Sequence, residues 1–192
     1  MIEPWVGAEY RKTGLLLLGE SAYLIEKDGV FVDRGPRHAI DLVEDCFDNP
    51  HLFKGFIATV SRAICGIEKP SPAHLRGAWS RVAFTNYVAT PVGVGARTRP
   101  SEDQWTAAKV EFPGLLERLR PRRVVVLGET MWSRMPDTDC MYTDDVQGYR
   151  LPDGAMAVCW AMRHPSRGLS WRALAAVIQF ACGPELRGPA LD

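Results

Sequence analysis

Two short segments near opposite ends of the chain carry side chains suited to hydrolytic chemistry. Residues 19–23 (Gly-Glu-Ser-Ala-Tyr) follow an apolar run and present a carboxylate, a hydroxyl and an aromatic ring. Residues 163–167 (Arg-His-Pro-Ser-Arg) supply an imidazole between two guanidinium groups. A carboxylate can orient or deprotonate water, and an imidazole can donate a hydrogen bond to a leaving group that gains negative charge. A fold that joins the two segments would therefore assemble a hydrolytic site.

Apolar runs and helical patterns alternate along the chain, which is typical of parallel strands joined by helices. The unbroken run 15–18 predicts a strand that is buried on both faces. The remaining predicted strands are 81–88, 124–128 and 156–160, and the predicted helices are 37–47, 52–65, 130–135, 171–182 and one that starts at Ser101. We expect an α/β fold, a three-layer α/β/α sandwich with a four-stranded, mainly parallel sheet. Residues 1–192 should form a single domain.

Local signals mark the ends of several elements. Ser101 and Gln104 have the spacing of a capping box, and Pro113 is expected to kink or split the helix that they open. Residues 149–154 have the composition of a hairpin turn. The long segment 24–77 separates the first two strands and is expected to hold two helices, broken after them by Pro70-Ser71-Pro72.

Polar side chains follow each of the four predicted strands. Glu20 comes after the first strand, Asn86 lies near the end of the second, the residues after Gly128 follow the third and His164 follows the fourth. Ligands of open α/β sheets bind outside the carboxyl ends of parallel strands. The pattern therefore predicts that these residues meet at one edge of the sheet.

The ordered set of motifs resembles the uracil-DNA glycosylase superfamily. Gly19-Glu20-Ser21-Ala22-Tyr23 is similar to the first motif of that family, and His164-Pro165-Ser166 matches the second. The resemblance implies that Glu20 and His164 are the catalytic residues. It also implies that Ser21, Tyr23 and Asn86 bind the base. An amide such as that of Asn86 offers both a donor and an acceptor to one edge of a pyrimidine.

The resemblance implies a reaction on DNA without metal or cofactor. A base flipped out of the stack loses its N-glycosidic bond, and an abasic site remains. Uracil is the base expected from the family, and a hypermodified pyrimidine of phage DNA is the alternative, with DNA repair or antiphage defence as the corresponding role. Residues expected to contact DNA are Arg97, Arg99, Arg163, Ser166, Arg167 and Leu169. Arg167 and Leu169 are the candidates for filling the gap that the flipped base leaves.

The composition sets limits on partners and compartment. Lysine plus arginine and aspartate plus glutamate both number 23, so the formal net charge is zero and DNA contact requires a local positive patch. Five cysteines without a C-x-x-C pair indicate reduced thiols rather than a disulfide framework or a metal ribbon. No apolar stretch reaches 18 residues, so we expect no membrane span and predict a cytoplasmic monomer.

Two other functions remain open. SGNH-type serine esterases have the same order of residues, with Ser21, Asn86 and His164 in the corresponding places. In those enzymes an aspartate stands three residues before the histidine, whereas this chain has Ala161 there, so the histidine lacks its usual orienting acid. A non-catalytic member of the glycosylase fold that only binds DNA is the third possibility.

Overall fold

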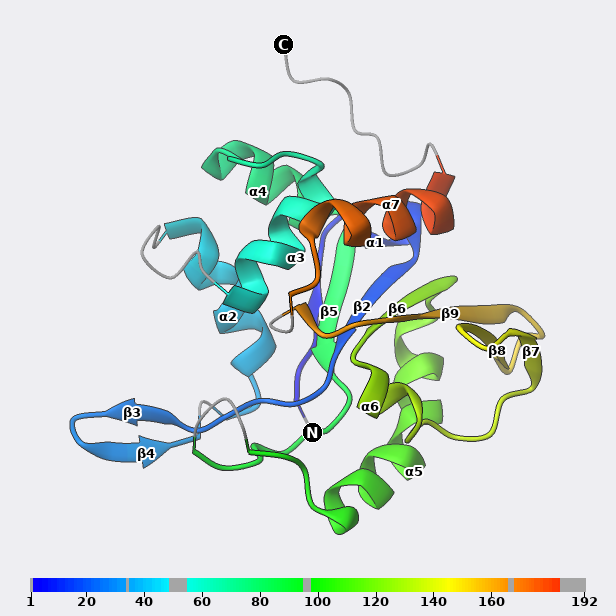
Figure 1. The fold of residues 1–192 in the computed structure, drawn as a ribbon, viewed down its shortest axis with the longest axis horizontal. Helices are drawn as coiled ribbons and strands as arrows, with labels where there is room; N and C mark the ends of the chain where they lie inside the picture. The colour runs from blue at the N-terminus through cyan, green and yellow to red at the C-terminus, as the bar shows by residue number, and fades with distance from the viewer. Residues whose placement is uncertain (1, 34, 49–54, 95–97, 166–167, 184–192) are drawn as a thin grey trace.

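A seven-stranded sheet forms the centre of the protein (Figure 1). The computed structural model describes residues 2–33, 35–48, 55–94, 98–165 and 168–183. The strand order is β1-β5-β2-β6-β9-β8-β7, and β3 and β4 form a separate two-stranded hairpin. The strands are β1 (Trp5–Val6), β2 (Leu15–Gly19), β3 (Ile25–Lys27), β4 (Val30–Val32), β5 (Val82–Asn86), β6 (Arg123–Leu127), β7 (Cys140–Thr143), β8 (Val146–Arg150) and β9 (Met156–Met162).

The four predicted strands form the parallel middle of this sheet. Strands β5, β2, β6 and β9 lie side by side in parallel, and β1, β8 and β7 extend the sheet as antiparallel edges. The α/β fold is therefore confirmed, whereas the expected number of four strands is wrong. Strand β1 has only two residues, which is too short for a recognisable pattern. Strand β7 has only four residues, lies at the sheet edge and is mostly exposed.

Helices cover both faces of the sheet, so the three-layer arrangement is confirmed (Figure 1). The helices are α1 (Tyr10–Thr13), α2 (His38–Asp48), α3 (Gly55–Cys65), α4 (Pro72–Trp79), α5 (Glu102–Leu119), α6 (Glu129–Trp132) and α7 (Trp171–Cys182). One apolar cluster joins the sheet to α2, α3, α4 and α7, and the other joins it to α1, α5 and α6. None of the described helices combines the length and the apolar character needed to span a membrane.

The apolar strand β2 fixes the position of the site because it is buried on both faces. Leu15 and Leu17 pack in the cluster with α3 and α7, while Leu16 and Leu18 pack in the cluster with α5. Each fully buried leucine contributes about 1.5–3 kcal/mol relative to an exposed one. A shift of one residue in register would exchange the two faces, so this burial holds the end of β2 in place.

The helix caps predicted from the sequence are present, whereas the predicted split of a helix at Pro113 is not. Ser101 accepts a hydrogen bond from the backbone N–H of Gln104, whose side chain accepts one from the N–H of Ser101, so the capping box is confirmed. Ser170 caps α7, which ends at Cys182 as predicted. Helix α5 runs unbroken through Pro113, so the expected split is wrong. Pro113 is exposed, and on that side water can replace the hydrogen bond that proline cannot donate.

The segment 24–77 is more structured than expected. It contains the β3–β4 hairpin and three helices, of which the sequence predicted only the two that correspond to α2 and α3. The first residues of the second predicted helix, 52–54, lie outside the described residues. Pro72 begins α4 rather than breaking the pattern, because Ser71 caps this helix and proline fits its first turn.

Candidate functional site

The carboxyl ends of the parallel strands bring the predicted polar residues to one edge of the sheet. Gly19 at the end of β2 lies in register with Asn86 at the end of β5. The backbone carbonyl of Gly19 accepts a hydrogen bond from the N–H of Tyr87 (2.8 Å), so the chain after β5 stays attached to the end of β2. His164 follows β9 closely. The expected convergence of these strand ends is confirmed.

Glu20 is a buried carboxylate with an arginine partner. It is only 6% exposed, and its Oε1 lies 2.7 Å from Nη1 of Arg99. Burial of an unpaired charge is costly, so the guanidinium is what makes an ionised carboxylate possible at this position. The side chain of Arg99 is itself 44% exposed, which leaves part of it accessible from the surface. The sequence predicted Arg99 as a DNA contact and gave no sign of this ion pair.

Five predicted site residues line one largely apolar cavity of about 250 Å³. The lining residues are Glu20, Ser21, Ala22, Tyr23, His38, Leu42, Phe56, Phe84, Asn86 and His164. Apolar and aromatic walls with a few polar groups are typical of small-molecule sites. The sequence did not identify His38, Leu42 and Phe56 as site residues, although the apolar spacing of α2 and α3 indicated that these helices pack on the sheet.

A second, more polar cavity adjoins the first. It measures about 220 Å³ and is lined by Glu20, Arg99, Gly128, Glu129, Thr130, Arg163 and His164. Arg163 is exposed, and its Nε lies 3.4 Å from Oε1 of Glu129. Glu20 and His164 line both cavities. A ligand that occupied both cavities would therefore contact the carboxylate and the imidazole.

His164 is held against aromatic side chains. Its ring centroid lies 5.6 Å from that of Phe56, which in turn packs 5.9 Å from the ring of Phe84. Burial lowers the pKa of His164 below the usual 6.5, Arg99 acts in the same direction, and Glu20 opposes them. His164 is therefore neutral at pH 7 and has one ring N–H to donate.

Ser21 and Tyr23 present hydroxyl groups beside Glu20. The Oγ atom of Ser21 is buried and has no hydrogen-bond partner within the described part of the chain. Burial raises the pKa of Tyr23, and the carboxylate of Glu20 adds to this effect. Tyr23 is therefore a neutral phenol at pH 7, and both residues line the apolar cavity.

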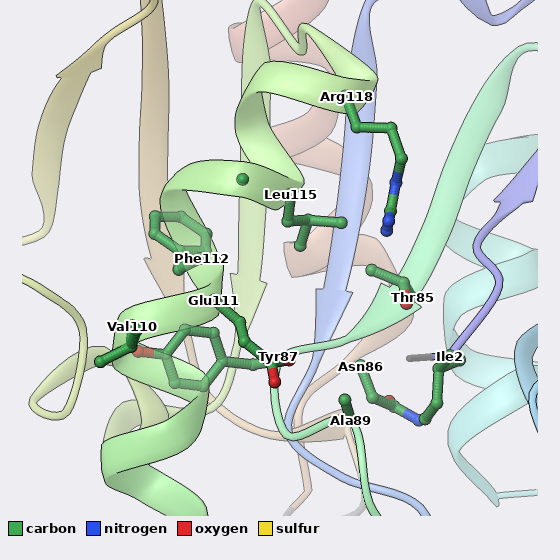
Figure 2. A pocket seen from close by; sticks show the side chains of 11 residues that line it. Ile2, Thr85, Asn86, Tyr87, Ala89, Val110, Glu111, Phe112, Leu115 and Arg118 are labelled. Atoms are coloured by element: carbon green, nitrogen blue, oxygen red, sulfur yellow. The ribbon is translucent and has the colours of Figure 1, made fainter.

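Asn86 lines two hollows. Besides the apolar cavity it lines a hollow of about 250 Å³ beside α5, where its side chain extends toward Ile2 (Figure 2). A β-carbon at position 19 would overlap the amide oxygen of Asn86. Glycine at the end of β2 therefore makes room for this amide, and the two residues are structurally coupled.

The remaining predicted DNA contacts have different positions. Leu169 is half-buried and packs against the apolar cluster that includes α3 and α7, so its side chain belongs to the periphery of the core. Arg97, Ser166 and Arg167 lie outside the described residues. The side chains of Arg99 and Arg163 both line the polar cavity.

Comparison with known protein families and curated proteins gave no match. None of the five cysteines forms a disulfide, and no three His, Cys, Asp or Glu side chains gather as metal ligands among the described residues. The geometry of the two cavities is therefore the observation from which a function can be inferred.

The lowered pKa of His164 predicts a pH dependence of stability. Because the unfolded chain binds a proton at higher pH than the buried imidazole does, the free energy of unfolding should fall as the pH falls below about 6.5. The fall should not exceed about 1.4 kcal/mol per pH unit, the value for one proton. His164→Gln should flatten this part of the curve in urea unfolding between pH 5 and pH 8. Parallel curves for both proteins would show that His164 is not buried in its neutral form.

Proposed function

We propose that this protein is a DNA glycosylase of the uracil-DNA glycosylase type, which hydrolyses the N-glycosidic bond of a flipped pyrimidine and leaves an abasic site. One observation carries the proposal. Glu20 and His164 stand between an apolar cavity that also contains Ser21, Tyr23 and Asn86 and a polar cavity that contains Arg99 and Arg163. This is the arrangement needed to hold a base on one side and a sugar with its phosphates on the other.

The apolar cavity has the chemistry of a base pocket. The rings of Phe56 and Phe84 give it flat apolar walls, and bases that have left the helical stack are held by such surfaces. The amide of Asn86 offers a donor and an acceptor to one edge of the base. Gly19 keeps that amide in place, because a side chain there would displace it.

Glu20 is positioned to act on the sugar. As the glycosidic bond breaks, positive charge develops on the sugar, and a nearby carboxylate stabilises it and can orient or deprotonate the attacking water. The carboxylate is almost fully buried, so little water screens its charge. Arg99 keeps one of its oxygens fixed at 2.7 Å. The other oxygen, Oε2, lies beside Gly128 in the polar cavity, where the sugar is expected.

His164 completes the reaction by acting on the base. The departing base carries negative charge on its ring and carbonyl oxygens, and a hydrogen-bond donor aimed at that charge lowers the barrier. A neutral imidazole with a lowered pKa can donate without carrying its own positive charge into the pocket. The ring of Phe56 limits how far the imidazole can turn.

DNA would approach from the side of the polar cavity. The chain has no net charge, so phosphate contact must be local, and Arg163 and the exposed part of Arg99 supply positive charge there. The exposed Glu129 partly neutralises Arg163 in the free protein, so phosphate would have to compete with this pair. No cofactor takes part in the proposed reaction.

The test of this function is release of a base from defined DNA. Duplexes that contain uracil, hypoxanthine, 5-hydroxymethylcytosine or its glucosylated form should be incubated with the protein and then cleaved with alkali, which breaks the strand at abasic sites. We expect strand breaks with at least one modified or deaminated pyrimidine and none with unmodified DNA. The base that reacts distinguishes a repair role from a role in antiphage defence. Binding without breaks in every duplex would indicate a non-catalytic DNA-binding protein.

The esterase alternative is weaker in this geometry. A serine nucleophile requires a hydrogen bond to its general base, and the Oγ atom of Ser21 has no such partner among the described residues. Turnover of p-nitrophenyl acetate that is lost in Ser21→Ala would reinstate the esterase.

The first prediction of the glycosylase mechanism concerns Glu20. Glu20→Gln keeps the shape of the side chain and removes its charge, so DNA binding should stay within a few-fold while the excision rate falls about 10²–10⁴-fold. Ser21→Ala should lower the rate much less. Single-turnover excision and a binding titration on the same duplex measure both quantities.

A matched control is available for this change. Glu102 pairs with Arg134 at 2.5 Å and 2.9 Å on the exposed start of α5, so Glu102→Gln also breaks a glutamate–arginine pair. It should leave excision unchanged. A larger loss in Ser21→Ala than in Glu20→Gln would transfer the central role from the carboxylate to the hydroxyl.

The second prediction concerns the choice of base. In Asn86→Ala the edge of the base loses its polar partner, so the preference for the best base over the next best should fall by about tenfold or more. The excision rates of the whole duplex panel measure this preference. Gly19→Ala should reduce it too, because the added β-carbon displaces the Asn86 amide. An unchanged preference in both variants would remove Asn86 from the base pocket.

A further inference from the structure

The β3–β4 hairpin exposes apolar side chains to solvent. Its strands pair only with each other, and Asp28 and Gly29, both with positive φ, form the tight turn between them. Val30 is 60% exposed and Phe31 is 48% exposed. A two-stranded hairpin is marginally stable by itself, and an exposed aromatic ring adds nothing to its stability in water. These side chains therefore indicate a contact surface.

The hairpin starts and ends beside the apolar cavity. Tyr23, which lines the cavity, comes shortly before β3, and His38, which also lines it, begins the helix that follows β4. Leu24 is tied to the loop after β5, because its N–H donates to the carbonyl of Gly93 (2.9 Å). The hairpin projects from the side of the molecule where β2 and β5 end (Figure 1). The chain therefore joins the hairpin at both ends to residues that line the apolar cavity.

A flipped base leaves a gap in the duplex that a side chain must fill. Apolar wedges such as phenylalanine or leucine do this by inserting between base steps. Leu169, the apolar candidate from the sequence, packs against the core. The other exposed large apolar side chains of the described part of the chain are Val6, Val94, Val110, Met141, Tyr142 and Phe180. Phe31 is the one described phenylalanine that is exposed on a segment joined to the cavity.

Acidic side chains surround Phe31 on the hairpin. Glu26 lies directly opposite Phe31 on the neighbouring strand, and Asp28 and Asp33 are exposed as well. Carboxylates repel the phosphate backbone, so these side chains supply no phosphate contact, and a favourable contact between the hairpin and DNA has to come from its apolar side chains. An apolar ring that enters the base stack gains contact area without a phosphate partner.

We propose that Phe31 of the β3–β4 hairpin inserts into the base stack of duplex DNA and holds open the gap beside the flipped nucleotide. This inference rests on the proposed glycosylase function. The wedge then comes from the segment between β2 and α2; Arg167, the other candidate from the sequence, lies outside the described residues. It acts only on duplex DNA, because a single strand has no stack to hold open.

The test compares duplex and single-stranded substrates. Phe31→Ser should slow excision from a duplex by about tenfold or more and leave excision from the same single strand within a factor of about two. Phe31→Leu should restore most of the duplex rate. Phe180, an 82% exposed phenylalanine of α7, provides the matched control, and Phe180→Ser should change neither rate. Equal rates for Phe31→Ser and wild type on the duplex, or equal losses on both substrates, would overturn the wedge.

A second measurement separates this inference from the glycosylase function. The substrate is a duplex in which the fluorescent base 2-aminopurine lies next to a tetrahydrofuran abasic site. The fluorescence of 2-aminopurine rises when this base is unstacked, so the measurement requires no bond cleavage. Wild-type protein should raise the fluorescence, and Phe31→Ser should bind without raising it. If the wild type released no base and Phe31 still controlled the fluorescence, the glycosylase function would fail and the wedge would stand. If Phe31→Ser raised the fluorescence fully, the wedge would fail while the function stood.

Discussion

The ion pair between Glu20 and Arg99 is the interaction on which the site depends. A carboxylate that is almost fully buried at the end of β2 has to be compensated, and the guanidinium at 2.7 Å does so. Arg99 comes from the loop between β5 and α5, so this pair also ties that loop to the end of β2. The ion pair therefore holds the carboxylate in one orientation, between an apolar and a polar cavity.

The rest of the fold holds this pair in place. Strand β2 is packed by leucines on both faces, and Gly19 leaves room for the amide of Asn86 from the neighbouring strand. His164 reaches the same point from β9, with the ring of Phe56 against it. The parallel middle of the sheet therefore sets the relative positions of acid, amide and imidazole, and the segment 24–77 closes the apolar cavity around them.

The sequence predicted the elements whose patterns are strong and local. Strands that are buried on both faces read as unbroken apolar runs, and the polar residues that follow them must meet at one edge, which is how Glu20, Asn86 and His164 were found. It missed β1, β7 and the β3–β4 hairpin, which are short or exposed, and also β8, whose buried residues include Gln147 and Gly148 and so give no apolar run. The pairing of Arg99 with Glu20 and the part that Phe56 plays in the cavity are tertiary contacts between distant segments, for which no local pattern exists.

The central claim is that the buried carboxylate of Glu20 stabilises a cationic sugar. The most direct measurement compares the affinity of the protein for a duplex with a cationic pyrrolidine abasic analogue and for one with the neutral tetrahydrofuran analogue. We expect the wild type to bind the cationic analogue about 10²-fold or more tightly, as for a transition-state mimic, and Glu20→Gln to lose this preference. Equal affinity of the wild type for both duplexes, or a preference that survives in Glu20→Gln, would contradict it.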